Sequence, residues 1–438
     1  MDINRAQLII FGGIGVIITI AVLIIYGVIP GLREPPPERF TITVWGFENE
    51  RFWKDITDKY RAKYFYVTIS YAQKDPVTYE SDLLNALAAG IGPDIFVLNN
   101  AQITKHKEKI LPLPQDALSF NVRDFKNIFF DAASLDLVTK DGEILGVPVT
   151  LETLALFYNR DFLNSANIAN PPKTWEGFVD AVKKLTTYTE VGTVVRSGAA
   201  LGTSGNVLHA FDILSALFLQ SGVEPFNRDT GKSGFRAGLP TGGIQGPGES
   251  ALDFYTSFAD TGKRTYSWSS FFPDSLTAFA QEKTAMMLGY PADFPAIVEK
   301  NPHLSFDVSA FPQSANAEAT TYYARYNFET VSKQSKYRDE AWKFLLWLSE
   351  NENDKAFADA LNLPPARRDL VGSKPPKDYL QVFYDQVLSS KTWLIPDKDK
   401  ISPIFNEMID SVANKSASVE AAVGRADARI NNLFAPQP

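Results

Sequence analysis

The sequence predicts an α/β protein of two lobes, and three observations favour this fold class. The chain has 438 residues, and chains of this length usually divide into lobes of about 100 to 200 residues. Its composition, with 45% hydrophobic and 21% charged residues, is that of a folded protein. Between residues 40 and 98, segments with strand and helix periodicity alternate, which is typical of a parallel sheet covered by helices.

The first lobe begins with the order strand, helix, strand, helix, strand. Residues 40–47 (FTITVWGF) and 65–72 (FYVTISYA) are rich in β-branched and aromatic residues, and residues 93–98 (PDIFVL) form a short apolar run. The intervening segments have the apolar spacing of helices, and Gly90 ends the second one. Such units form right-handed parallel sheets that bind ligands beyond the carboxyl ends of their strands. Those ends carry Phe47, Glu48, Asn49, Gln73, Lys74, Asp75, Asn99 and Asn100.

The next part of the chain contains an acidic residue inside an apolar run. Residues 137–149 predict a hairpin, and the chain continues through GVPVTLETLALFYN at residues 146–159. Glu152 lies at the middle of this run, where an ionisable group costs several kcal/mol unless it is paired or faces something polar. A helix capped by Thr174 opens a second lobe.

Later segments predict further elements of this second lobe and of the end of the chain. A helix is expected at residues 274–282, followed by the buried strand AMMLGY, which ends just before Asp293. Amphipathic helices are expected at residues 339–350 and 419–433. Residues 231–248 are rich in Gly and Pro but have no phosphate-binding pattern, so we expect a surface loop there.

The composition excludes several kinds of chemistry. The chain has no cysteine, so disulfides, thiolate nucleophiles and lipid attachment to cysteine are excluded. His106, His209 and His303 are widely spaced and lie in no metal-ligand or catalytic motif, so we expect no metal and no cofactor. A formal net charge of −8 without a long basic cluster argues against nucleic-acid binding.

The N-terminus predicts a membrane anchor. Residues 8–29 contain no charged residue and would span about 30 Å as a helix, which matches the hydrocarbon core of a bilayer. No small-residue cleavage site precedes Pro30, so an uncleaved signal anchor is expected. We therefore expect residues 1–7 in the cytoplasm, a transmembrane helix at 8–29, a stiff linker at 30–39 and the globular part on the extracytoplasmic side of the cell membrane.

Three stretches of the sequence together resemble one family of binding proteins. They are GIGPDIFVL at 90–98, GVPVTLETLALFYNRDFL with PPKTWEGFVDAVKKLT from 146 to 186, and FAQEKTAMMLGYPADF at 279–294. They are similar to the extracellular solute-binding proteins of ABC importers, specifically the large family of maltose-type and other carbohydrate receptors. The resemblance covers roughly residues 40–434, although the lipid-anchoring cysteine of many relatives and the tryptophan that maltose binders carry near residues 290–294 are missing.

The resemblance implies a bilobal, periplasmic-binding-protein-like fold. Two α/β lobes would be joined by crossover strands and would close on a ligand by a hinge motion. The N-terminal lobe is expected to comprise residues 40–151 and 311–363, and the C-terminal lobe residues 152–310 and 364–434. Each lobe would therefore be discontinuous in sequence.

The same resemblance suggests a role for the acidic residue in the apolar run. The chain would cross between the lobes near residues 150–153, 307–312 and 363–366. Glu152 would then lie at the floor of the cleft, where its carboxylate can accept hydrogen bonds from ligand hydroxyls. The alternative is a hydrogen bond between the lobes without ligand contact.

Sugar binding requires flat aromatic faces and planar polar groups on pre-formed walls, and the sequence supplies both at strand ends and in loops. An aromatic residue at such a position can instead belong to the core. Trp53, Trp175, Trp342 and Trp347 lie on apolar helical faces, so we expect these four in the core. The predicted ligand-binding residues are Trp45, Phe47, Glu48, Asn99, Asn100, Glu152, Trp268, Tyr290, Asp293, Tyr322 and Trp393.

These observations together predict a monomeric, membrane-anchored solute receptor rather than an enzyme. It would bind a small polar ligand, preferably a carbohydrate, and deliver it to the permease subunits of an ABC importer. One alternative is an anchored surface sensor or structural protein with the same fold. A glycoside-acting enzyme is the other alternative, but it would need two carboxylates about 5 to 10 Å apart, one with a raised pKa. No nucleophile elbow or metal triad occurs, so we expect no catalytic residues.

Overall fold

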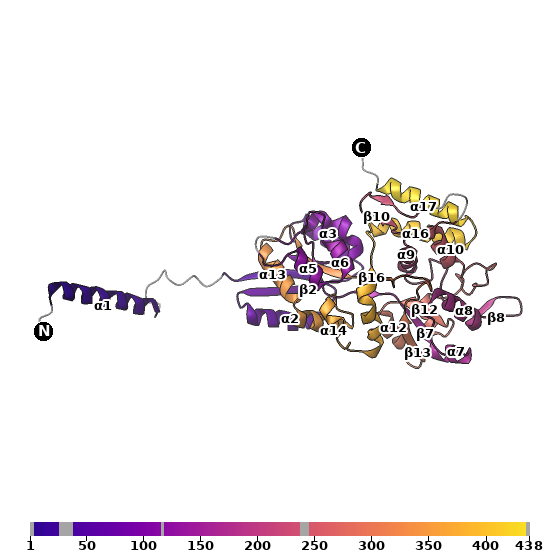
Figure 1. The fold of residues 1–438 in the computed structure, drawn as a ribbon, viewed down its shortest axis with the longest axis horizontal. Helices are drawn as coiled ribbons and strands as arrows, with labels where there is room; N and C mark the ends of the chain where they lie inside the picture. The colour runs from indigo at the N-terminus through magenta and orange to yellow at the C-terminus, as the bar shows by residue number, and fades with distance from the viewer. Residues whose placement is uncertain (1–3, 26–37, 115–117, 237–244, 435–438) are drawn as a thin grey trace.

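The structure of the protein is a computed structural model that describes residues 4–25, 38–114, 118–236 and 245–434. Figure 1 shows the chain after residue 38 as two adjoining lobes, each with helices around a sheet. The predicted bilobal α/β fold is therefore confirmed.

The first sheet contains the predicted parallel strands. β1 (Phe40–Gly46) pairs in parallel with β2 (Val67–Gln73) on one side and with β3 (Ile95–Asn99) on the other. The connections are α2 (Glu50–Lys63) and α3 (Tyr79–Ala88), which bury their apolar faces against the sheet. The alternating sequence pattern predicts these five elements correctly because each is local and strongly periodic.

A segment from much later in the chain completes this sheet. β15 (Asn327–Ser332) pairs antiparallel with β3, and the short strands β4 (Ile110–Leu111) and β5 (Val147–Pro148) pair antiparallel with β15. α13 (Arg338–Leu348) follows β15 and packs on it. The predicted core residues Trp53 and Trp342 are fully buried among these elements, and Trp347 is also buried.

The second lobe has a smaller, antiparallel sheet. β7 (Ala155–Asn159) lies between β12 (Met286–Gly289) and β13 (Phe306–Ala310) and is antiparallel to both. All four residues of β12 and most of β7 are buried, so this short sheet lies inside the lobe. α9 (Ala210–Gln220) is buried from Ala210 to Phe218 and is the central helix of the lobe.

Other helices enclose this core. α8 (Trp175–Leu185) begins at the predicted cap, where the Thr174 hydroxyl accepts a hydrogen bond from the Gly177 N–H at 3.1 Å. Trp175 is buried on this helix, as predicted. The remaining helices of the lobe are α7 (Arg160–Ser165), α10 (Pro247–Thr256), α11 (Ser275–Ala280), α12 (Asp293–Lys300), α15 (Gln381–Gln386), α16 (Lys398–Ala413) and α17 (Val419–Leu433).

The lobes are joined where three passes of the chain hydrogen-bond to one another. β6 (Glu152–Thr153) pairs antiparallel with β14 (Tyr322–Arg325), and β14 pairs in parallel with β16 (Ser390–Lys391). The Leu151 N–H donates to the Pro364 carbonyl at 3.1 Å, and the Ala366 N–H donates to the Val149 carbonyl at 2.9 Å. The segments expected to cross near residues 150–153 and 363–366 thus lie side by side.

The position of the remaining crossing strand differs from the expectation. Residues 306–310 form β13, an edge strand inside the second sheet, and β14 at residues 322–325 is the strand that pairs with β6. The apolar pattern FDVSAF fits a strand in either place, and only the long-range pairing with β7 decides between them.

The predicted transmembrane span is not supported. A helix does form near the N-terminus: α1 runs from Arg5 to Ile25, the last described residue before a gap, and begins before the predicted residue 8. Within the described part of the chain, no helix combines the length and the apolar character that a membrane crossing requires. Residues 26–29 of the predicted span and residues 30–37 of the predicted linker lie outside the described residues.

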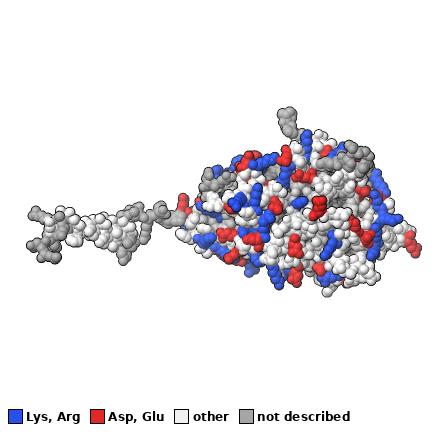
Figure 2. Space-filling model, viewed as in Figure 1, with Lys and Arg blue, Asp and Glu red and all other residues white. Residues whose placement is uncertain are grey.

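Charged side chains of both signs are interspersed over the surface shown in Figure 2. Lys and Arg alternate with Asp and Glu on this face of both lobes, without an extended basic area.

The buried side chain of Asp354 should make the stability of the protein depend on pH. Asp354 lies on α14 (Asn351–Leu361), is 0% exposed, and has no hydrogen-bond partner for either carboxyl oxygen. Burial raises the pKa of Asp354 well above its ordinary value, although nearby Arg367 acts in the opposite direction. Because the folded protein retains this proton to higher pH than the unfolded chain, its stability falls as pH rises from the ordinary aspartate pKa toward the raised one.

We expect Asp354→Asn to raise the free energy of unfolding at pH 8 by on the order of 1 kcal/mol, because the amide has no charge to lose. The gain should be smaller at pH 5, because more of the wild-type carboxyl is protonated there. Urea unfolding at both pH values measures the effect, and Asp55→Asn on the exposed face of α2 is the matched control. If the gain in the free energy of unfolding does not increase from pH 5 to pH 8, the pKa of Asp354 is not raised in the folded protein.

Candidate functional site

A cavity of about 1060 Å³ lies between the two lobes. The first lobe contributes Phe47, Glu48, Asn327, Glu329 and Phe357, and the second contributes Arg160, Phe294, Phe306, Asp307 and Tyr379. Thr150 and Glu152 line it where the chain crosses between the lobes. The size is sufficient for a small-molecule ligand, since such sites usually measure about 300 to 1,000 Å³.

The second-lobe wall of the cavity is aromatic. The rings of Phe294 and Tyr379 are stacked in parallel, with centroids 3.8 Å apart and an interplanar angle of 4°. Phe306 lies against Phe294 with a centroid distance of 4.7 Å. These residues come from α12, from the segment before α15 and from β13, so three parts of the lobe fix the orientation of the rings. A flat, half-buried surface of this kind suits the apolar face of a ligand.

The structure shows how the acidic residue in the apolar run is accommodated. Glu152 lies opposite Arg325 in the β6–β14 pair, and its Oε2 accepts a hydrogen bond from Arg325 Nε at 2.8 Å. The two side chains are only 18% and 28% exposed, so the ion pair is largely removed from water. Glu152 also lines the cavity. Its position therefore permits the ligand contact predicted from the sequence, and the crossing strands supply its partner.

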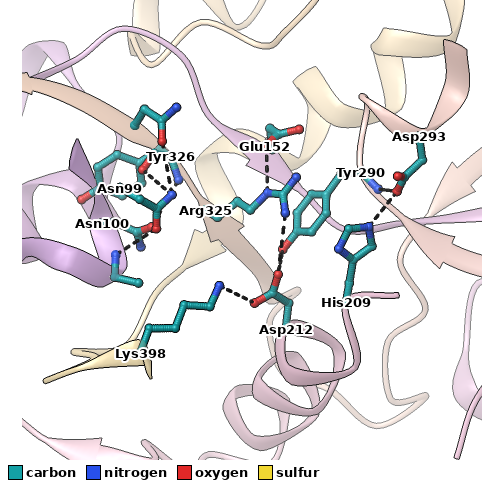
Figure 3. A network of polar contacts seen from close by, with 12 residues as sticks. Asn99, Asn100, Glu152, His209, Asp212, Tyr290, Asp293, Arg325, Tyr326 and Lys398 are labelled. Carbon is teal, nitrogen blue, oxygen red and sulfur yellow. Dashed lines mark hydrogen bonds and ion pairs between the residues drawn. The ribbon is translucent and has the colours of Figure 1, made fainter. Parts of the chain in front are cut away.

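Arg325 is the centre of a larger polar network, which Figure 3 shows. Its guanidinium lies 3.6 Å from the centroid of the Tyr290 ring, and its Nη1 is 4.0 Å from Asp212 Oδ2. The Tyr290 hydroxyl donates to the same Asp212 oxygen at 2.9 Å, and Lys398 Nζ lies 4.0 Å from the other one. Burial disfavours the charge on Arg325, but Glu152, Tyr290 and Asp212 together raise its pKa above the ordinary value. Arg325 is therefore a permanent cation between two carboxylates.

Asp293 holds Tyr290 in this network. Its Oδ2 accepts a hydrogen bond from the Tyr290 N–H at 2.7 Å and lies 3.0 Å from His209 Nε2. The His209 ring meets the Tyr290 ring edge to face at 4.8 Å. His209 has a positive φ of 62°, an uncommon conformation for a residue with a side chain, and it directly precedes α9. Asp293 thus orients the aromatic ring on which Arg325 rests.

Three of the predicted ligand-binding residues, Phe47, Glu48 and Glu152, line the cavity. Tyr290 and Asp293 belong to the adjoining network. Asn99 and Asn100 lie at the end of β3, as predicted, and both bond to Tyr326: Asn99 Nδ2 donates to its carbonyl at 3.2 Å, and Asn100 Oδ1 accepts from its N–H at 3.3 Å.

The other predicted aromatic residues lie away from the cavity. Trp268 is 0% exposed, stacks on Phe272 at 4.7 Å, and donates from Nε1 to Asn206 Oδ1 at 3.1 Å. Trp393 is 2% exposed and packs in the second-lobe core, as does the buried Tyr322. The ring of Trp45 is covered by Lys74, whose Nζ lies 3.7 Å from the ring centroid. The polar loops around Trp268 and Trp393 suggested open aromatic faces, but distant segments cover both rings.

Several cavity residues were not identified from the sequence. Arg160 and Asp307 form an ion pair at 2.6 Å across 147 positions, and no local pattern predicts such a pair. Phe294 is the last residue of the stretch FAQEKTAMMLGYPADF, so its position after a buried strand could have identified it as a cavity residue. Glu329 had a signal as well, because it is the only charged residue in the strand sequence NFETVS.

The first-lobe wall carries two acids in different environments. Glu48 Oε2 accepts hydrogen bonds from Trp53 Nε1 at 3.1 Å and from the Tyr71 hydroxyl at 3.2 Å. Glu329 is 3% exposed, and its Oε2 has no hydrogen-bond partner. Burial, together with the nearby Glu48 carboxylate, raises the pKa of Glu329 well above its ordinary value. Glu48 thus accepts hydrogen bonds from two other side chains, whereas Glu329 accepts none from another side chain among the described residues.

The lining of the cavity is acidic overall, with six carboxyl groups and two basic groups. The acids are Glu48, Glu152, Glu299, Asp307, Glu329 and Asp378, and the bases are Arg160 and Lys377. Arg160 is already paired with Asp307. No group of three or more His, Cys, Asp or Glu that could hold a metal ion occurs within the described residues. The site therefore offers hydrogen-bond acceptors and aromatic faces, a combination suited to an uncharged polar ligand.

Comparison with known proteins identifies a family. Residues 55–383 match the family model described as bacterial extracellular solute-binding protein, which covers well over half of the chain. A binding protein of Brucella abortus is 22% identical over 402 residues, 91% of each chain. A maltodextrin-binding protein of Bacillus subtilis is 24% identical over 278 residues, 64% of this chain and 61% of that protein.

Solved structures with the same fold include two sugar-binding proteins. The cyclic α-maltosyl-1,6-maltose binding protein of Arthrobacter globiformis has a TM-score of 0.74 at 18% identity, over 90% of this chain and 99% of that chain. The sugar-binding protein of Xanthomonas citri has a TM-score of 0.74 at 19% identity, over 90% and 98%. At these identities the similarity shows the fold.

A double-mutant cycle tests the ion pair at the crossing strands. We expect Arg325→Met to lower the free energy of unfolding by up to about 3 kcal/mol, because it leaves a largely buried carboxylate without its cation. Adding Glu152→Gln should recover part of this loss, since the uncompensated charge is then gone. Urea unfolding of the two single variants and the double variant gives the coupling energy.

The exposed i,i+4 pair Lys54–Asp58 on α2 is the matched control, with the same 2.6 to 2.8 Å separation but open to water. Its cycle, Lys54→Met with Asp58→Asn, should show a much smaller coupling because solvent screens exposed charges. Equal couplings in the two cycles would contradict a buried, structural role for Glu152 and Arg325.

Proposed function

Because the chain belongs to the bacterial extracellular solute-binding protein family, we propose that it captures a carbohydrate between its lobes and delivers it to an ABC importer. Proteins of this family bind solutes and are not enzymes, and their globular part lies outside the cytoplasm. The observation that carries the proposal is the cavity between the lobes, which combines stacked aromatic rings on one wall with carboxyl groups on the other.

The chemistry of the cavity supports a sugar over other polar solutes. A pyranose has an apolar C–H face, which would lie on the Phe294 and Tyr379 rings, and hydroxyls at its edge, which would donate to carboxylates such as Glu48 and Glu152. The acidic lining disfavours phosphorylated and acidic sugars because like charges repel. Relatives named as maltodextrin-binding and multiple sugar-binding proteins support the same ligand class.

The arrangement of the walls also supports a receptor that closes around its ligand. The cavity is lined from both lobes, and the lobes are joined by strands that can act as a hinge. A ligand that contacts both walls would favour a closed arrangement, which the permease subunits could distinguish from the empty receptor. We expect the receptor to act as a monomer.

A thermal-shift screen of the full chain tests the ligand class. The panel contains maltose, maltotetraose, lactose and tagatose, with glucose 6-phosphate, amino acids and short peptides for comparison. A ligand present at 100 times its dissociation constant should add about 2.7 kcal/mol of stability and raise the melting midpoint. A shift with neutral sugars but not with glucose 6-phosphate is the expected result. If amino acids or peptides alone produce the shift, the carbohydrate proposal is wrong.

The aromatic wall can be tested with one variant. Tyr379→Ala removes the outer ring of the stack, and we expect affinity for the sugar identified in the screen to fall by roughly fivefold, about 1 kcal/mol. Isothermal titration calorimetry measures the change. The control is Tyr188→Ala on the second lobe, because Tyr188 is 46% exposed and lies outside the cavity lining. Unchanged affinity in Tyr379→Ala would show that the ligand does not lie on this wall.

A further inference from the structure

We propose that Glu329 is a protonated carboxylic acid that donates a hydrogen bond to the ligand from the first-lobe wall of the cavity. The inference rests on the proposed carbohydrate function for the identity of the ligand. It adds the residue that would supply a donor in a cavity otherwise dominated by acceptors.

The position of Glu329 on its strand directs it toward the cavity. Side chains alternate between the two faces of a strand, so Glu329 shares a face of β15 with Asn327, and both line the cavity. Asn327 is exposed at the strand end, and Glu329 lies two residues further into the sheet. Phe328 and Thr330 occupy the opposite face, where the Thr330 hydroxyl donates to the Leu145 carbonyl at 2.6 Å. Glu329 is thus the deeper polar residue on the cavity side.

The carboxyl group of Glu329 has one oxygen without a hydrogen-bond partner among the described residues. This oxygen, Oε2, is itself buried, and the residue is 3% exposed. Most buried polar atoms in proteins are hydrogen-bonded, so an unpartnered one on a residue that lines a ligand-sized cavity points to a partner that the ligand supplies when the side chain turns toward it. By contrast, both donors to Glu48 Oε2 come from the protein itself.

Among the described residues, the group that stabilises the charged form of Glu329 is its own backbone N–H, and no cation acts on its carboxyl group. The titratable side chains that face it are Glu48 after β1, Tyr71 on β2, Tyr79 on α3 and Asp354 on α14. Arg367, the cation nearest to Asp354, bonds to Asp369 at 2.9 Å and to the Ser349 carbonyl at 2.7 Å. Burial and the neighbouring Glu48 raise the pKa of Glu329 well above its ordinary value. The protonated form of Glu329 is therefore retained to a higher pH than in an ordinary glutamate.

Protonation changes what the cavity can recognise. An ionised carboxylate only accepts hydrogen bonds, whereas a carboxylic acid also donates one. With Glu48 and Glu152 as acceptors and Glu329 as a donor, the wall matches a ligand that is donor and acceptor at once, as a hydroxyl is. An ionised Glu329 would instead repel Glu48 and lose its donor. Ligand binding should consequently weaken when pH rises above the raised pKa of Glu329.

A carboxyl titration tests the protonation of Glu329 without any ligand. The full chain is labelled with ¹³C at the glutamate side-chain carboxyl carbon, and the Glu329 signal is assigned as the one missing from Glu329→Gln. We expect this signal to titrate at a pH well above the ordinary glutamate pKa. A Glu329 signal that titrates near the ordinary glutamate pKa would overturn the proposal.

Two variants test the contact with the ligand, using maltotetraose or whichever sugar of the panel binds. Glu329→Gln keeps a hydrogen-bond donor and cannot ionise, so its affinity for the sugar should stay within about twofold of wild type. Its affinity should also no longer decrease at high pH. Glu329→Met has a similar shape without a donor and should bind roughly tenfold more weakly. Glu420→Gln, on the exposed face of α17 and outside the cavity lining, is the control and should bind normally.

The outcomes separate this inference from the proposed function. If Glu329 is protonated but Glu329→Met binds as well as wild type, the ligand contact is wrong. If Glu329→Met does not fold, the pH dependence of sugar affinity in Glu329→Gln tests the ligand contact instead. A loss of affinity at high pH that persists in Glu329→Gln cannot come from Glu329 and would overturn the inference. If no sugar binds, the carbohydrate proposal fails, and an ionised Glu329 in the ligand-free titration would overturn the inference as well.

Discussion

The pairing of the crossing strands is the constraint on which the rest of the structure depends. The hydrogen bonds between Leu151 and Pro364, between Ala366 and Val149, and along β6 and β14 hold three distant parts of the chain together. They fix where each lobe begins, and therefore which residues face the space between the lobes. The cavity residues come from segments as far apart as Phe47 and Tyr379, and only these crossings bring them to one place.

The protein accommodates buried carboxyl groups in two ways. Glu152 and Asp212 lie beside cations, with Arg325 and Lys398 as their partners. Glu329 and Asp354 form no ion pair within the described residues, and burial raises the pKa of each above its ordinary value. The paired carboxyl groups lie at the crossing strands, where a fixed charge pair resists rearrangement. The carboxyl groups with a raised pKa lie inside the first lobe, where the neutral form of an acid avoids the cost of a buried charge.

Much of the fold could be predicted from the sequence because its elements are locally encoded. The parallel start of the first sheet, the Thr174 cap and the last helix follow from periodicity and capping residues that lie next to one another. The cavity was harder to predict because its chemistry depends on long-range pairs. No sequence pattern near Glu152 predicts its pairing with Arg325, which lies 173 positions away, and none near Arg160 predicts its pairing with Asp307. Trp393 shows the same limit, because Phe211 and Phe405 cover its ring through tertiary packing. Trp268 stacks on the nearby Phe272, but its indole N–H donates to Asn206, 62 positions away.

The two walls of the cavity divide the work of recognition between the lobes. The stacked rings that suit the flat face of a sugar lie on the second lobe, and Glu48, Glu152 and Glu329 lie on the first lobe and the crossing strand. The second lobe also supplies the acids Glu299, Asp307 and Asp378, and the first lobe supplies the rings of Phe47 and Phe357. On the proposed function, neither wall alone satisfies the ligand, so full affinity requires both lobes in place. A ligand shifts a conformational equilibrium only as far as it binds one state better than the other. Separate walls supply that difference directly, because opening the lobes would remove the aromatic contacts or the hydrogen bonds from the bound sugar.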